Sequence, residues 1–121
     1  MELELLKESF SICRLSSPDD VDMDAEFTFF SRTDGELSLV CPTKAAPDCE
    51  KRVDGRRALR VKGALDFSLV GVIAKISNAL AEKKIPVFVV STYDTDYIFV
   101  EEARLDEAVA ALEGAGCEVS S

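Results

Sequence analysis

Residues 56–121 alternate between two hydrophobic periods in a fixed order, and this order restricts the fold more than any other feature of the chain. Apolar residues at every second position are typical of a strand with one buried face, whereas spacings of three and four residues are typical of a helix. The expected elements are a strand at 59–65, a helix at 69–80, strands at 86–93 and 96–101, a helix at 105–112 and a strand at 117–119.

This β-α-β-β-α-β order is that of the ferredoxin-like split βαβ arrangement, an α+β fold with an antiparallel sheet. The apolar segment 86–93 is expected to be a central strand. Segment 59–65 is expected to be an edge strand, since it carries basic residues on one face. Asp66 or Ser68 is expected to cap the first helix by accepting bonds from free backbone N–H groups.

Residues 1–55 repeat the same order more weakly. Strands are expected at 10–15, 27–31 and 36–41, with one helical turn near 17–20 and a short helix or loop at 42–51. We therefore predict a tandem duplication of two units, a degenerate N-terminal unit at 1–55 and a C-terminal unit at 56–121.

Composition excludes several classes of function. The chain has 121 residues, a net charge of −9 and no histidine. The negative charge argues against nucleic acid and anionic membrane surfaces as partners. The absence of histidine removes Ser-His-Asp catalysis and the usual zinc sites, so we expect no metal and no cofactor. Met1 is not followed by a secretory signal pattern, and we expect a cytoplasmic protein.

The four cysteines lack CxxC spacing and are expected to be reduced. Cys13, Cys41 and Cys117 lie in apolar strand patterns, which favours packing. Cys49 lies in a polar segment, where both solvent exposure and a redox role stay open. A basic cluster is either the solvent face of a strand or a patch for an anion or partner; its members are Lys51, Arg52, Arg56, Arg57, Arg60 and Lys62.

Three segments of the second half carry a recognisable pattern. They are the strand-loop-helix Leu65 to Ala74, the strand entry Ile85-Pro-Val-Phe88, and the hairpin Ser91-Thr-Tyr-Asp-Thr-Asp-Tyr-Ile98. Together they resemble the ACT domain, a ferredoxin-like fold that senses amino acids. The combination is similar to small stand-alone proteins with two ACT-like units, and to the units of cytosolic arginine sensors of the CASTOR type. The resemblance implies a non-enzymatic regulator that binds a small ligand, an amino acid, and a homodimer or a regulated protein partner.

The residues themselves indicate how a zwitterion could bind. Backbone N–H groups at the first helix's start attract an anion such as an α-carboxylate, and Gly71 permits close approach. Asp66 and Asp96 are candidates for an ammonium group. The resemblance adds contacts from Thr92, Tyr93 and Asp96. The full candidate site is Asp66, Phe67, Ser68, Leu69, Val70, Gly71, Thr92, Tyr93 and Asp96.

Other interpretations stay open from sequence. Asp66 can be only a helix cap, Asp94 only a turn residue, and Tyr93 and Tyr97 half-buried sheet residues. The chain can also be a ligand-free module that docks a partner through an exposed sheet edge.

An acyl-phosphate hydrolase needs a water-orienting amide, but the chain offers only Asn78, in mid-helix. An RNA-binding sheet needs a basic surface with aromatic residues, and no such motif is present.

Overall fold

The computed structural model describes residues 1–49, 51–62 and 71–121, which form two compact units. Met1–Lys7 and Arg57–Ser121 make unit 1, and Glu8–Arg56 make unit 2. This division differs from the expected 1–55 and 56–121 because the first seven residues cluster with the second half of the chain.

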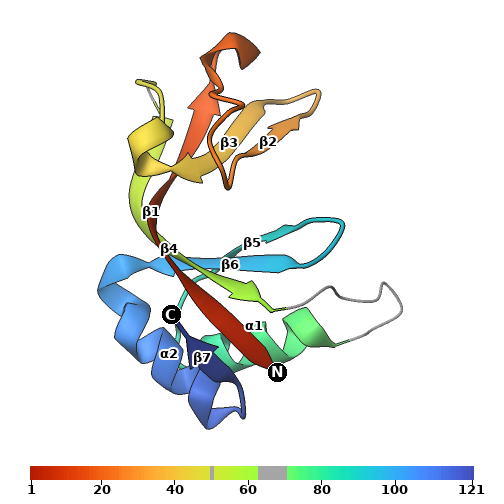
Figure 1. Ribbon diagram of the computed structural model, residues 1–121, viewed down its shortest axis with the longest axis vertical. Helices are drawn as coiled ribbons and strands as arrows, with labels where there is room; N and C mark the ends of the chain where they lie inside the picture. The colour runs from red at the N-terminus through yellow and green to blue at the C-terminus, as the bar shows by residue number, and fades with distance from the viewer. Residues whose placement is uncertain (50, 63–70) are drawn as a thin grey trace. The chain divides into compact units, whose positions relative to one another are not determined.

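The elements follow one another as predicted in type, with short 3-10 turns (η) where the first half was expected to have weak helices (Figure 1). Their bounds are β1 Glu2–Leu15, η1 Pro18–Asp20, β2 Phe29–Arg32, β3 Leu37–Pro42, η2 Thr43–Ala45, β4 Lys51–Val61, α1 Val72–Glu82, β5 Phe88–Ser91, β6 Asp96–Glu101, η3 Glu102–Arg104, α2 Leu105–Gly114 and β7 Glu118–Ser120.

Hydrogen bonds join the described strands in the order β2-β3-β1-β4-β6-β5, and β7 pairs with β1. The pairs β1–β3, β2–β3 and β5–β6 are antiparallel, whereas β1–β7 is parallel. The expected positions of two strands are therefore wrong. β4 is internal and β5 ends the order of strands, because the N-terminal half of β1 pairs beside β4.

Strand β1 is longer than predicted. It begins at Glu2, whereas the expected strand began at residue 10. Its first residues alternate between glutamate and leucine up to Leu5, which is the period of a half-buried strand. Leu3 is fully buried in the core of unit 1, so the apolar side of this alternation faces that core.

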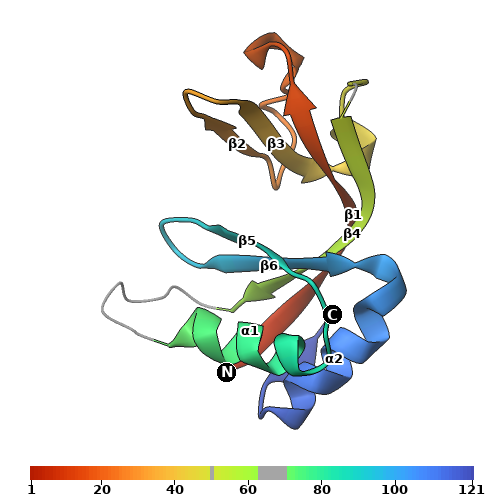
Figure 2. The same ribbon diagram turned by 180° about the vertical axis from the view of Figure 1, so that it is seen from behind.

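The core of unit 1 lies between its strands and the two helices, which pack side by side on one face of the sheet (Figures 1 and 2). Both helices present the apolar stripe that the sequence predicted, and Ile76, Leu80, Ala108 and Leu112 are buried. The strands contribute Leu3, Leu59, Val61, Ile98 and Val100, and the helix ends add Ile85 and Cys117.

The ends of the helices are fixed by backbone and guanidinium contacts. Gly71, with φ 81°, occupies the N-cap of α1, and the predicted capping residues Asp66 and Ser68 lie outside the described residues. At the other end, Arg104 donates to the carbonyl oxygens of Lys83 and Lys84 at 3.2 and 3.3 Å. A cation at this position satisfies free carbonyl groups and opposes the negative end of the helix dipole.

The hairpin between β5 and β6 is tied to β4 by one buried side chain. Thr95 is 8% exposed, and its Oγ1 donates to the carbonyl oxygen of Val61 at 2.7 Å. Val61 is the last residue of β4. This bond fixes the turn of the hairpin against the end of the neighbouring strand.

Replacing Leu80 with Ala removes a fully buried side chain from the contact between the helices and the sheet. We expect the free energy of unfolding to fall by about 2–5 kcal/mol, because the transfer and cavity terms add. Urea denaturation followed by circular dichroism measures the loss. Met23→Ala, at a side chain 72% exposed, is the matched control and should change little. A loss for Leu80→Ala as small as for the control contradicts this core.

Replacing Thr95 with Val keeps the shape of the side chain but removes its hydroxyl. The Val61 carbonyl then lacks this buried donor, and we expect a loss of about 1–3 kcal/mol in urea denaturation. Thr95→Ser keeps the hydroxyl and should retain most of the stability. A loss for Thr95→Ser that exceeds the loss for Thr95→Val would show that the methyl group, and not the hydrogen bond, holds the hairpin.

Candidate functional site

The hairpin turn at residues 92–95 is a closed hydrogen-bonded loop. The backbone N–H of Thr92 donates to the carbonyl oxygen of Thr95 at 2.8 Å. The Thr92 hydroxyl donates to the same oxygen at 3.1 Å and accepts from the Thr95 N–H at 3.3 Å. Asp94 lies within this turn, as its alternative interpretation held. The conformation of the turn is therefore set by its two threonines. The carboxylates of Asp94, in the turn, and Asp96, directly after it, are left for other contacts.

The remaining predicted hairpin residues differ in exposure. Asp96 is half-buried and pairs with Ser91 at the start of β6. Tyr93 is 82% exposed, so its alternative interpretation as a half-buried sheet residue is wrong, whereas Tyr97 is half-buried. Thr92 is exposed at the end of β5. Thr92 and Asp96 thus flank one turn, with carboxylate and hydroxyl oxygens available on its surface.

The other part of the predicted site is the connection between β4 and α1. Asp66, Phe67, Ser68, Leu69 and Val70 lie outside the described residues. Gly71 is described, and its carbonyl oxygen accepts from the N–H of Lys75 at 2.9 Å in the first turn of α1. A Cβ at Gly71 would meet no atom within 4 Å among the described residues, so its positive φ, and not crowding, favours glycine there.

Thr95 relates the two parts of the predicted site. Its bond to Val61 holds the hairpin turn at the end of β4, the strand that leads into the β4–α1 connection. Sequence reasoning missed this role, since Thr95 was taken only as a turn residue. The signal available was its position between two aspartates at the end of an apolar hairpin, where a buried hydroxyl needs an acceptor.

Acidic side chains of β4 itself and of other elements pair with four residues of the basic cluster. The Arg60 guanidinium donates to Glu4 Oε1 at 2.7 and 3.3 Å and lies 5.9 Å from the ring centroid of Tyr97. The Arg60 hydrogen bond holds the pKa of the Glu4 carboxyl below its usual value. The further ion pairs are Arg52–Asp54, Arg57–Glu102 and Lys62–Glu2. Most of the basic side chains of the cluster therefore have acidic partners within the chain, and their presence does not require a bound anion or partner protein.

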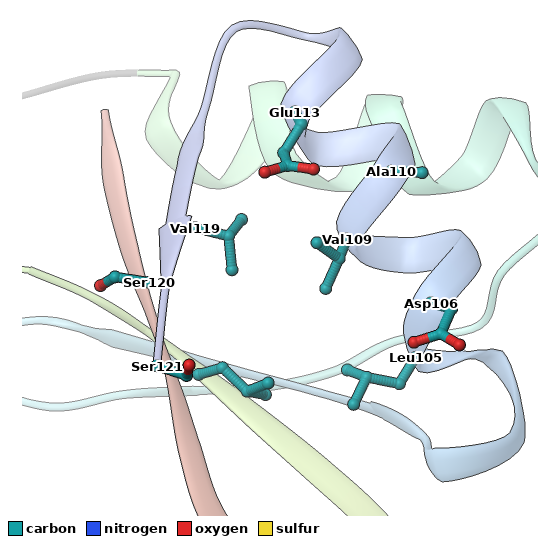
Figure 3. Close-up of a pocket in the computed structure, with 9 residues that line it drawn as sticks. Leu105, Asp106, Val109, Ala110, Glu113, Val119, Ser120 and Ser121 are labelled. Atoms are coloured by element: carbon teal, nitrogen blue, oxygen red, sulfur yellow. The ribbon is translucent and has the colours of Figure 1, made fainter.

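A cavity of about 320 Å³ lies between α2 and β7 (Figure 3). Leu5, Leu105, Val109 and Val119 give it an apolar lining, and the carboxylates of Asp106 and Glu113 lie at its sides. A second hollow, of about 590 Å³, is lined by small residues of α1 and α2, among them Ala79, Ala111 and Gly114. None of the predicted site residues that the structure describes lines either cavity.

Two further features bear on the class of site. Within residues 1–49, 51–62 and 71–121, no three histidine, cysteine or acidic side chains are grouped as metal ligands. In the same part of the chain, no helix has both the length and the apolar composition needed to cross a bilayer.

Comparisons with known proteins identify the family. The family model for the ACT domain matches residues 51–114, from the start of β4 to the end of α2. The crystal structure of a protein from Agobacterium tumefaciens is 30% identical, has a TM-score of 0.87, and aligns over 98% of this chain and 90% of that one.

Two more distant structures share the fold. A protein of unknown function from Vibrio cholerae is 22% identical with a TM-score of 0.72, over 91% of this chain and 85% of that one. The ligand-free regulatory subunit of aspartate kinase from Thermus thermophilus is 10% identical with a TM-score of 0.64, over 94% and 96%. No curated protein matches the chain in sequence. The family model matches more than half of this chain, and the Agobacterium structure is similar over nearly all of it. These two findings show that the chain belongs to the ACT domain family.

Proposed function

We propose that this protein is a non-enzymatic regulator that binds an amino acid through its C-terminal ACT unit. Membership of the ACT family and the likeness in fold to a regulatory subunit of aspartate kinase support a regulatory role that depends on a ligand. The free thiols of all four cysteines are consistent with action in the cytoplasm.

The proposed site combines the β4–α1 connection with the hairpin turn. Its members are Asp66, Phe67, Ser68, Leu69, Val70, Gly71, Thr92, Tyr93 and Asp96. The observation that carries the proposal is the 2.7 Å bond from Thr95 to Val61, which keeps the turn beside the strand that enters the connection.

The charges suit the two ends of a zwitterion. The start of α1 carries the positive end of the helix dipole and attracts an α-carboxylate. Asp96, half-buried beside the turn, is a carboxylate for the α-ammonium or for a cationic side chain. We propose that the ligand bridges these two features.

We also propose that the chain is a tandem duplication of two ACT-like units. Residues 8–56 follow the order β1-η1-β2-β3-η2-β4, and residues 57–121 follow β4-α1-β5-β6-α2-β7. In unit 2 the strands pair in the order β2-β3-β1-β4, and in unit 1 the corresponding order is β5-β6-β4, then β1, then β7. The two orders are the same except that β1 is inserted between β4 and β7, and unit 2 has 3-10 turns in place of the helices of unit 1.

A second candidate function is docking of a partner, or of a second copy, along β5. β5 ends the order of described strands, and Phe88 and Val89 are 38% and 36% exposed. A strand edge with exposed apolar side chains can add a further strand from another chain. This function requires no small ligand, so binding and assembly measurements separate it from the first.

Ligand binding predicts a selective thermal shift. One amino acid among the twenty, at about 100 times its dissociation constant, should stabilise the protein by about 2.7 kcal/mol and raise Tm by several degrees. Asp96→Ala should remove the shift, whereas Asp94→Ala, in the same turn, should keep it. The proposed site is contradicted if none of the twenty amino acids raises Tm, or if Asp96→Ala and Asp94→Ala lose the ligand-induced rise in Tm equally.

Docking along β5 predicts a dimer whose formation depends on the edge. Light scattering after size-exclusion chromatography should give twice the chain mass for the native protein and the single chain mass for Val89→Lys, because a lysine on an edge strand opposes pairing. Met23→Lys, at another exposed position, is the control and should leave the dimer intact. A monomeric native protein with no partner would rule out this function.

A further inference from the structure

Three of the four cysteines gather in the core of unit 2. Cys13 on β1 and Cys41 on β3 are each 2% exposed, and Cys49, in the connection between η2 and β4, packs against them. Cys13 pairs in register with Leu39, so Cys41 is its diagonal neighbour on the same face of the sheet. The sequence separates these residues widely, and only the fold brings their thiols together.

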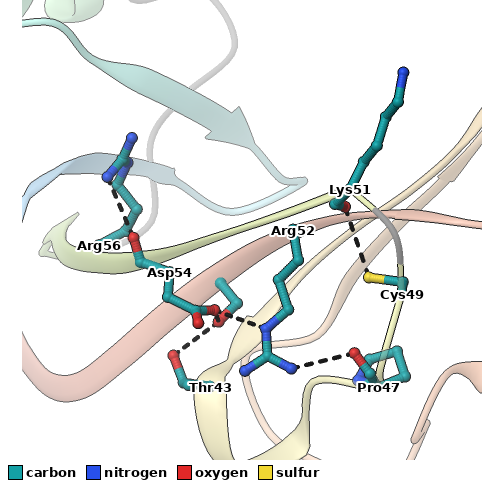
Figure 4. Close-up of polar contacts among 8 residues, drawn as sticks. Thr43, Pro47, Cys49, Lys51, Arg52, Asp54 and Arg56 are labelled. Atoms are coloured by element: carbon teal, nitrogen blue, oxygen red, sulfur yellow. Dashed lines mark hydrogen bonds and ion pairs between the residues drawn. The ribbon is translucent and has the colours of Figure 1, made fainter.

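Cys49 packs against the buried cluster that contains Cys13. The Cys49 thiol donates to the carbonyl oxygen of Lys51 at 3.6 Å (Figure 4). Cys13 is buried whereas Cys49 is half-buried. An oxidant in solution therefore reaches Cys49 first, with the Cys13 sulfur already beside it.

A fixed cation lies next to this pair. The Arg52 guanidinium donates to Asp54 Oδ1 at 2.7 Å and to the carbonyl oxygen of Pro47 at 3.2 Å (Figure 4). Asp54 is held in turn by a hydrogen bond from the buried hydroxyl of Ser11. Arg52 is close enough to interact electrostatically with both Cys13 and Cys49. The thiolate form of a cysteine is the nucleophilic one.

Burial keeps the Cys13 thiol protonated. Burial, and then the neighbouring thiols of Cys49 and Cys41, raise the pKa of Cys13 to about 12, and Arg52 opposes only part of this increase. Cys13 thus stays a protonated thiol near neutral pH. Its protonation and its burial both make Cys13 the second sulfur to react.

We propose that Cys49 and Cys13 are a peroxide-reactive thiol pair, in which Cys49 is oxidised first and Cys13 resolves it as an intramolecular disulfide. In the first step the Cys49 thiolate attacks one peroxide oxygen, the O–O bond breaks, and Cys49 becomes a sulfenic acid while hydroxide leaves and is protonated. In the second step the Cys13 sulfur attacks the Cys49 sulfur, the S–O bond breaks, and water leaves with the Cys13 proton. Two thiols and one hydrogen peroxide give one disulfide and two waters.

The direct test uses the full chain treated with hydrogen peroxide at a few equivalents. Thiol titration of the denatured protein should fall from four groups to two, and the intact mass should fall by two hydrogens. Peptide mapping without reduction should find Cys13 joined to Cys49, and a thiol reductant should restore all four groups. A disulfide that joins Cys49 to Cys41, or to Cys49 of another molecule, overturns the proposal, as does retention of all four thiols.

Variants assign the two roles. In Cys49→Ser the rapid loss of thiols should disappear, and in Cys13→Ser Cys49 should accumulate as a sulfenic acid that reacts with dimedone. Cys117→Ser, a buried cysteine of unit 1, is the matched control and should form the disulfide as the native chain does. Arg52→Met should slow the oxidation of Cys49 several-fold. An unchanged rate in Cys49→Ser overturns the order proposed, and peptide mapping of the native chain decides the pairing even where Cys13→Ser fails to fold.

Discussion

The pairing of the N-terminal half of β1 beside β4 is the contact on which the sheet of unit 1 depends. The N–H of Lys62 donates to the carbonyl oxygen of Glu2 at 3.0 Å, and Arg60 pairs with Glu4 at 2.7 Å. β1 thereby places Leu3 in the core and gives β7 its parallel partner. It also makes β4 internal, and Arg57 and Arg60 of β4 meet the acidic side chains of Glu102 and Glu4 on other elements.

The sequence predicted the elements well and their neighbours poorly. The helical stripes that include Leu80 and Leu112 and the hairpin from 86 to 101 are local patterns, and the structure confirms them. The central and edge positions expected for segments 86–93 and 59–65 were wrong because they depend on pairing between residues far apart, such as Glu2 and Lys62. The thiol cluster could not be predicted either, since Cys13, Cys41 and Cys49 are far apart in the sequence and lie together only in the folded unit 2.

The candidate ligand site was predicted only in part for a similar reason. Thr92 and Asp96 were found from their polarity at the end of an apolar hairpin. The residue that fixes this turn, Thr95, owes its role to an acceptor 34 positions earlier in the chain. Side chains that touch a ligand can be recognised by their type, whereas those that position them depend on the fold. The proposed ligand site thus depends on the buried hydroxyl of Thr95 as well as on the charged groups that were predicted from the sequence.

The central claim is that an amino acid binds between the hairpin turn and the start of α1. Two-dimensional amide NMR of the labelled chain, recorded while each amino acid is added, tests it most directly. The account predicts saturable shifts, for one ligand, that concentrate at Gly71 and at residues 92–96. Shifts centred instead on the cavity between α2 and β7, or no shifts with any amino acid, would contradict it.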